Sequence, residues 1–140
     1  KLLKTLLIED NPADVELLKI AFEQTQIDTD IIVKTDGQEA IDYLFELAEN
    51  QPESEFPSLI FLDLNLPKKS GKEVLRLVKK DEKLRGVPII VMSTSDFRED
   101  VELCYKLYAN SYLVKPSDFS MFMDMVGSIK EFWYNKSVLP

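Results

Sequence analysis

The feature that most constrains the fold of this chain is a fivefold alternation of short apolar runs with longer amphipathic stretches. The apolar runs predict strands at residues 5–8, 31–34, 59–62, 87–92 and 112–114. The first, third and fourth runs are built almost entirely of Leu, Ile, Val and Phe, as strands covered on both faces are. Because each pair of parallel strands needs a helical crossover, the alternation predicts an α/β fold with a doubly wound, five-stranded parallel sheet.

The stretches between the strands carry signals for the starts of helices. Asn11, Asp36 and Ser70 are each expected to cap the helix that follows. We read the side chain of Asp36 as a cap and nothing more. Two further helices are expected at residues 96–108 and from 117 to about 133, so that the C-terminal helix and tail begin at about residue 118.

Length and charge exclude several classes of protein. With 140 residues the chain is expected to be a single domain, 1–140. The 25 acidic against 17 basic residues give a net charge of -8, which argues against binding nucleic acid or an anionic membrane surface. No apolar run approaches the roughly 20 residues of a membrane span, and a single Cys cannot form an internal disulfide, so we expect a cytoplasmic protein.

Polar side chains gather where the predicted strands end. In an open α/β sheet, ligands bind outside the carboxyl ends of the strands. The residues expected at that edge are Glu9, Asp10, Asp63, Asn65, Ser93 and Lys115. A single Asp or Ser at such a position is more often a cap or a loop residue, so the prediction rests on their convergence.

Crowded carboxylates repel one another unless a cation is bound among them. The available ligands are all oxygens, and the chain has no His, which favours Mg²⁺ over zinc or copper. We expect the ammonium group of Lys115 to hold the carboxylate of Asp63 in place. The sequence therefore predicts a magnesium site beside a reactive aspartate.

The segments 6–11, 61–71, 90–93 and 112–116 resemble the sequence blocks of response-regulator receiver domains, in order and with matching spacing. The resemblance covers essentially the whole chain. It implies the flavodoxin-like receiver fold with strand order 2-1-3-4-5. It also implies a protein of two-component signalling that accepts a phosphoryl group from a sensor histidine kinase and is not a turnover enzyme, although it can dephosphorylate itself.

The resemblance also implies roles for individual residues. Asp63 matches the phosphoacceptor. Asp10 and Asp63 match magnesium ligands, together with the backbone carbonyl of Asn65. The remaining matches are Glu9 as an acid that reaches the ion through water, Ser93 as the switch hydroxyl, Tyr112 as the switch aromatic and Lys115 as the basic partner. Phosphorylation is then expected to alter the face formed by the fourth helix, fifth strand and fifth helix.

A finer resemblance lies in residues 64–69 and in the ending from Phe132-Trp133 to 138–140. These segments look like the small stand-alone regulators that pair with bacterial and cyanobacterial phytochrome kinases. We therefore expect a phytochrome-type histidine kinase as the donor. With no output domain expected on the chain, signalling would pass to a downstream protein that the sequence does not identify.

The fifth helix carries more apolar surface than one sheet face normally needs. The stripe expected to cover the sheet is Phe122, Val126, Ile129 and Trp133, and the neighbouring stripe is Met121, Met125 and Phe132. A broad core contact explains this arc, and so does a homodimer built from this helix and the Trp133 tail. We favour the homodimer.

Two residues receive only structural roles. Cys104 is in step with apolar residues of the fourth helix, which predicts a buried thiol. Asp14 is interpreted as an acidic charge at the start of the first helix and nothing more.

Two other functions remain open at this point. A phosphohydrolase of the haloacid-dehalogenase type also places a nucleophilic Asp after an apolar strand, but it carries that Asp on its first strand. A receiver-like interaction module that is never phosphorylated would have no need of the crowded carboxylates. Catalytic release of phosphate would identify the hydrolase, and an absent magnesium response would identify the module.

Overall fold

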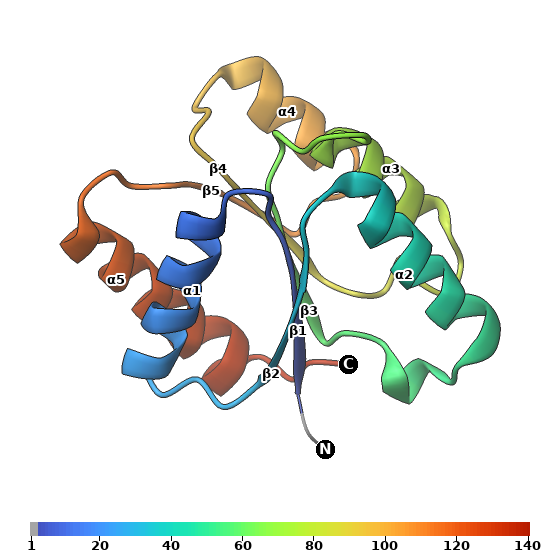
Figure 1. The fold of residues 1–140 in the computed structure, drawn as a ribbon, viewed down its shortest axis with the longest axis horizontal. Helices are drawn as coiled ribbons and strands as arrows, with labels where there is room; N and C mark the ends of the chain where they lie inside the picture. Colours follow the sequence, from blue (N-terminus) through green and yellow to red (C-terminus); the bar gives the residue numbers. More distant parts are fainter. Residues whose placement is uncertain (1–2) are drawn as a thin grey trace.

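The computed structural model describes residues 3–140 and contains one five-stranded parallel sheet in the order β2-β1-β3-β4-β5 (Figure 1). The strands are β1 (Lys4–Ile8), β2 (Asp30–Lys34), β3 (Leu59–Leu62), β4 (Ile89–Ser93) and β5 (Ser111–Val114). The predicted fold class and strand order are confirmed.

Helices cover both faces of the sheet. The helices α1 (Pro12–Gln24) and α5 (Phe119–Ile129) lie on one face, and α2 (Gly37–Asn50), α3 (Gly71–Lys80) and α4 (Arg98–Lys106) lie on the other (Figure 1). The expected caps form, since the side chains of Asn11, Asp36 and Ser70 each accept a hydrogen bond from a backbone N–H in the helix that follows. A short 3-10 helix, Glu53–Glu55, precedes β3.

The core consists of two apolar layers divided by the sheet. Along β3, Ile60 and Leu62 pack with the α2 and α3 side, while Leu59 and Phe61 pack with the α1 and α5 side. Every residue of β3 and β4 is buried. Together with β1, of which four residues are buried, this pattern confirms the expectation that the first, third and fourth apolar runs are strands covered on both faces.

Most elements differ from the predicted bounds by a residue or two, and two of the differences have a clear physical reason. The fourth strand begins at Ile89 instead of residue 87, because Pro88 has no N–H to donate to a strand ladder. The fourth helix spans Arg98–Lys106 instead of 96–108, and Tyr108 just after it takes the left-handed conformation, with φ 71°, that commonly ends a helix.

The chain beyond α5 packs against the sheet. A π-helical segment, Lys130–Lys136, continues α5, and the hydroxyl of Tyr134 lies 2.7 Å from Oγ1 of Thr5 in β1. Trp133 and Tyr134 both contact the core layer beneath α1 and α5. Within residues 3–140, no helix is long and apolar enough to cross a membrane.

Candidate functional site

The carboxyl ends of β1, β3, β4 and β5 meet at one rim of the sheet. The register aligns Ile8 with Leu62 and Leu62 with Val91, and Ser93 with Val114, so the residues that follow these strands emerge together. One carboxylate oxygen from each of Glu9, Asp10 and Asp63 lies within 4.8 Å of the others. The predicted convergence of acidic groups from two strands is therefore present.

The three carboxylates fit a hard divalent cation. Glu9 and Asp63 are buried, whereas Asp10 is exposed, so the cluster is open to solvent on one side. The ligand atoms are all oxygens, as Mg²⁺ prefers. The backbone N–H of Asn65 lies 3.4 Å from Oδ1 of Asp63, which places the next loop residue against the cluster.

Lys115 reaches into the cluster from the end of β5 and contacts three carboxylates. Its Nζ lies 2.6 Å from Oε1 of Glu9, 3.1 Å from Oδ2 of Asp14 and 3.7 Å from Oδ2 of Asp63. The first two are hydrogen bonds, and the third is an ion pair without one. The interpretation of Asp14 as a helix charge alone is therefore wrong, because this side chain is a direct partner of the site lysine.

The site carries more negative charge than its one lysine offsets. Burial raises the pKa of Glu9 to about 7, with the Asp63 carboxylate adding to the rise and the Lys115 ammonium opposing it. Burial lowers the pKa of Lys115, but its contacts with Glu9, Asp63 and Asp14 outweigh this and the net direction is upward. A bound cation would relieve this repulsion.

A close contact fixes the loop that follows Asp63. Gly71, the first residue of α3, donates its N–H to the carbonyl of Leu64. A Cβ at Gly71 would lie 2.2 Å from the Asp63 carbonyl oxygen and 2.6 Å from Cα of Leu64. Only glycine lets the start of α3 approach the backbone of Asp63 and Leu64 this closely.

Ser95 connects the two predicted switch residues. Ser93 is fully buried, and its Oγ accepts a hydrogen bond from the N–H of Ser95 at 3.1 Å. The hydroxyl of Tyr112 donates to the carbonyl of Ser95 at 2.8 Å. The hydroxyl of Ser95 in turn donates to Asp100, which pairs with Lys72 of α3. Sequence reasoning missed this link, because only the folded β4–α4 loop brings these groups together.

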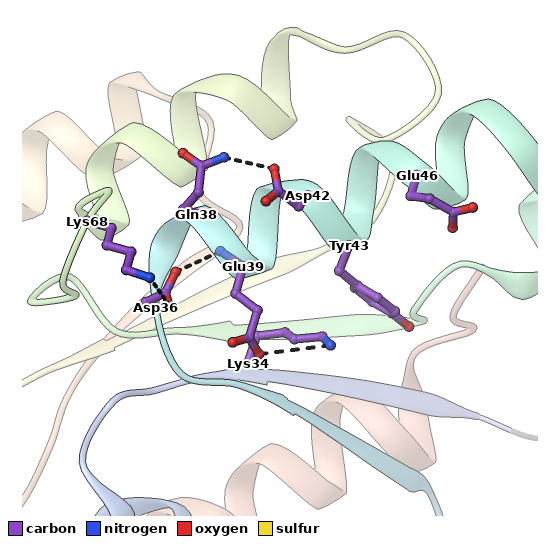
Figure 2. Close-up of a pocket in the computed structure, with 8 residues that line it drawn as sticks. All are labelled: Lys34, Asp36, Gln38, Glu39, Asp42, Tyr43, Glu46 and Lys68. Atoms are coloured by element: carbon purple, nitrogen blue, oxygen red, sulfur yellow. Dashed lines mark hydrogen bonds and ion pairs between the residues drawn. The ribbon is translucent and has the colours of Figure 1, made fainter.

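A surface hollow of about 500 Å³ lies along α2 beside the rim (Figure 2). Most of the polar side chains that line it form ion pairs or hydrogen bonds with one another. Lys68 pairs with Asp36 at 3.6 Å, Lys34 approaches Glu39 at 3.9 Å, and Gln38 donates to Asp42 at 2.8 Å. Asp36 therefore also pairs with a loop lysine, beyond the capping role expected of it. None of the predicted site residues lines this hollow.

A doubly wound parallel sheet with the strand order β2-β1-β3-β4-β5 belongs to the flavodoxin-like class of α/β proteins. Within that class, residues 5–127 match the family described as "Response regulator receiver domain". The chain therefore belongs to the response regulator receiver domain family. This assignment contradicts the alternative of a haloacid-dehalogenase-type hydrolase.

Similar proteins include regulators linked to phytochromes. Response regulator Rcp1 of Synechocystis sp. is 38% identical over 96% of this chain and 91% of its own, and the Mn²⁺-bound structure of Rcp1 superposes with a TM-score of 0.87. The phosphorylated cyanobacterial phytochrome response regulator RcpA is 37% identical, with a TM-score of 0.89 over 100% of this chain and 99% of that one. The "Probable methanogenesis regulatory protein FilR2" of Methanothrix harundinacea is 41% identical over 96% of this chain and 87% of its own.

Proposed function

We propose that this chain acts as a single receiver domain that accepts a phosphoryl group on Asp63 from the phosphohistidine of a sensor histidine kinase. The observation that carries this proposal is that Asp10 and Asp63, which follow two different strands, meet at the open edge of the sheet, with Lys115 3.7 Å from Asp63. In this setting the carboxylate of Asp63 can act as a nucleophile towards phosphorus. The acyl phosphate that forms would lie next to both the cation site and Lys115.

The residues suggest how the transfer proceeds. An Oδ atom of Asp63 attacks phosphorus, a new P–O bond forms, and the P–N bond to the donor imidazole breaks with its electron pair going to nitrogen. Asp10, Asp63 and the backbone carbonyl of Asn65 would hold Mg²⁺, with Glu9 reaching it through water. The ion would neutralise charge on the transferred group. Lys115 would pair with a phosphoryl oxygen of the product.

Signalling would start at Ser93. A phosphoryl group on Asp63 adds strong acceptor oxygens, which favours movement of the Ser93 hydroxyl towards it. This movement would compete with the hydrogen bond from Ser95, and the carbonyl of Ser95 also holds Tyr112. We therefore propose that α4, β5 and α5 form the output face.

The proposed donor is a phytochrome-type histidine kinase, and the similarity to the phytochrome response regulator RcpA supports this choice. A separate downstream protein would recognise the phosphorylated form.

We also propose a homodimer through α5 and the tail around Trp133. Support comes from the exposed side chains of Met121 and Phe132, which are 61% and 57% accessible, while Trp133 packs against the core.

Light scattering over a concentration series tests the homodimer. With beryllofluoride and Mg²⁺ bound, we expect a mass of about twice 16.1 kDa at micromolar protein. A mass of one chain under those conditions would exclude the dimer.

Magnesium binding and phosphorylation are tested together. Mg²⁺ at 100 times its dissociation constant should stabilise the fold by about 2.7 kcal/mol, which raises the melting temperature. Asp63→Asn should lose most of that gain and should take no label from acetyl phosphate. Asp28→Asn, which makes the same charge change outside the site, is the control. An unchanged magnesium response in Asp63→Asn would refute the ion site and favour the unphosphorylated interaction module.

A further inference from the structure

Lys115 is hydrogen-bonded to two carboxylates, and neither of them is the one that would be phosphorylated. Glu9 and Asp14 accept at 2.6 and 3.1 Å, whereas Asp63 stands at 3.7 Å, beyond hydrogen-bonding distance. Glu9 and Asp14 thus use two of the three N–H donors of the ammonium group. A phosphoryl group on Asp63 would bring new anionic acceptor oxygens close to Lys115 and would compete with both partners for it.

The two partners differ in how easily they can be released. The Glu9 side chain is only 4% exposed, so an unpaired Glu9 carboxylate would be left buried. The Asp14 side chain is 36% exposed and lies in the first turn of α1, so water can hydrate its carboxylate as soon as Lys115 leaves. Breaking the ion pair of Lys115 with Asp14 therefore costs less free energy than breaking the one with Glu9.

We propose that Asp14 is a positioning residue. Its ion pair holds the side chain of Lys115 in the unphosphorylated protein and breaks when a phosphoryl group is transferred to Asp63. The inference rests on the proposed phosphorylation of Asp63 and adds a residue to that site. The ion pair between Asp14 and Lys115 competes with the ion pair that forms in the phosphorylated protein. Asp14 consequently slows phosphorylation and weakens binding of phosphoryl analogues.

The variant Asp14→Asn tests this role, since the amide keeps the size of the side chain and removes its charge. Glu16→Gln is the matched control, because Glu16 is an exposed acid on the same helix and is not one of the three carboxylates that pair with Lys115. Both variants change the net charge by the same amount. Acetyl phosphate is the donor and beryllofluoride the analogue, because neither contacts a wider protein surface.

We expect Asp14→Asn to be phosphorylated about two- to fivefold faster than the unaltered protein and to bind beryllofluoride more tightly by a similar factor, as for the loss of one partly exposed ion pair. Glu16→Gln should match the unaltered protein in both measurements. The Mg²⁺ affinity of Asp14→Asn, measured by calorimetry, should stay within about twofold, because Asp14 is outside the group of three carboxylates that lie within 4.8 Å of one another. A general loosening of the fold would lower all three quantities together.

The outcomes separate the inference from the proposed function. If the unaltered protein takes no label and binds no beryllofluoride, the proposed function fails. If the unaltered protein does both and Asp14→Asn behaves as Glu16→Gln does, Asp14 plays no part in the site and the inference fails. A slower reaction in Asp14→Asn, with the fold intact by thermal unfolding, would overturn the inference too, because Asp14 would then be helping the transfer.

Discussion

Replacement of Gly71 by alanine should disturb the backbone at Asp63, just after β3, more than a substitution at an exposed position would. The new Cβ would lie 2.2 Å from the Asp63 carbonyl oxygen, and an ordinary contact begins at about 3.4 Å, so the two chain segments must separate by about 1 Å. The atoms in the way belong to the backbone of Asp63 and Leu64, so no side-chain rotation can relieve the clash. The strand itself, or the start of α3, has to shift.

The cost can be estimated against a control in the same protein. Overpacking of this kind typically costs about 1–3 kcal/mol. Gly127→Ala in α5 meets no atom within 4 Å and should gain up to about 1 kcal/mol from the higher helix propensity of alanine. The two alanine variants should therefore differ by about 1–4 kcal/mol in the free energy of unfolding, or roughly 4–15 °C in melting temperature.

Urea unfolding with and without Mg²⁺ measures both consequences of Gly71→Ala. We expect a lower unfolding free energy and a weaker magnesium response, because the shifted backbone carries Asp63 and leads to Asn65. Gly127→Ala should keep the full magnesium response. If Gly71→Ala is as stable as Gly127→Ala and binds Mg²⁺ as tightly, the close approach of α3 does not hold the site in place.

Two further predictions concern the core. Burial raises the pKa of Cys104 to about 11 from 9.0, so the stability that this thiol contributes is complete below pH 9 and is lost as the pH rises towards 11. Relative to Cys104→Ala, the unfolding free energy should fall by up to about 2.7 kcal/mol over that range in urea titrations, and equal pH slopes would contradict this. Tyr134→Phe should cost about 1 kcal/mol, because it removes the hydrogen bond to Thr5 and keeps the ring packed on Phe22. Thermal unfolding measures the loss, and an unchanged melting temperature would mean that this hydroxyl contributes nothing to holding the tail.

Several parts of the fold could be read from local sequence. The run at residues 59–62 is apolar at every position, and the structure buries all four of its residues. Asn11 and Ser70 cap their helices as expected, and Cys104 is buried. The predicted stripe of the fifth helix is confirmed too, since Phe122, Val126 and Ile129 are buried and Trp133 packs against the same core layer. These features depend on residues only a few positions apart.

The sequence by itself therefore determined the class of fold and the set of polar residues at the rim, because strand burial, helix caps and the common edge of a parallel sheet follow from short-range patterns. Only the tertiary structure decided which of those groups form ion pairs or hydrogen bonds with one another. Asp14 and Lys115 are 101 residues apart, and they meet because the order of the strands and the rotation of α1 bring both side chains to one place. The link through Ser95 and the approach of Gly71 to Asp63 have the same origin, since distances between elements depend on how whole elements pack together.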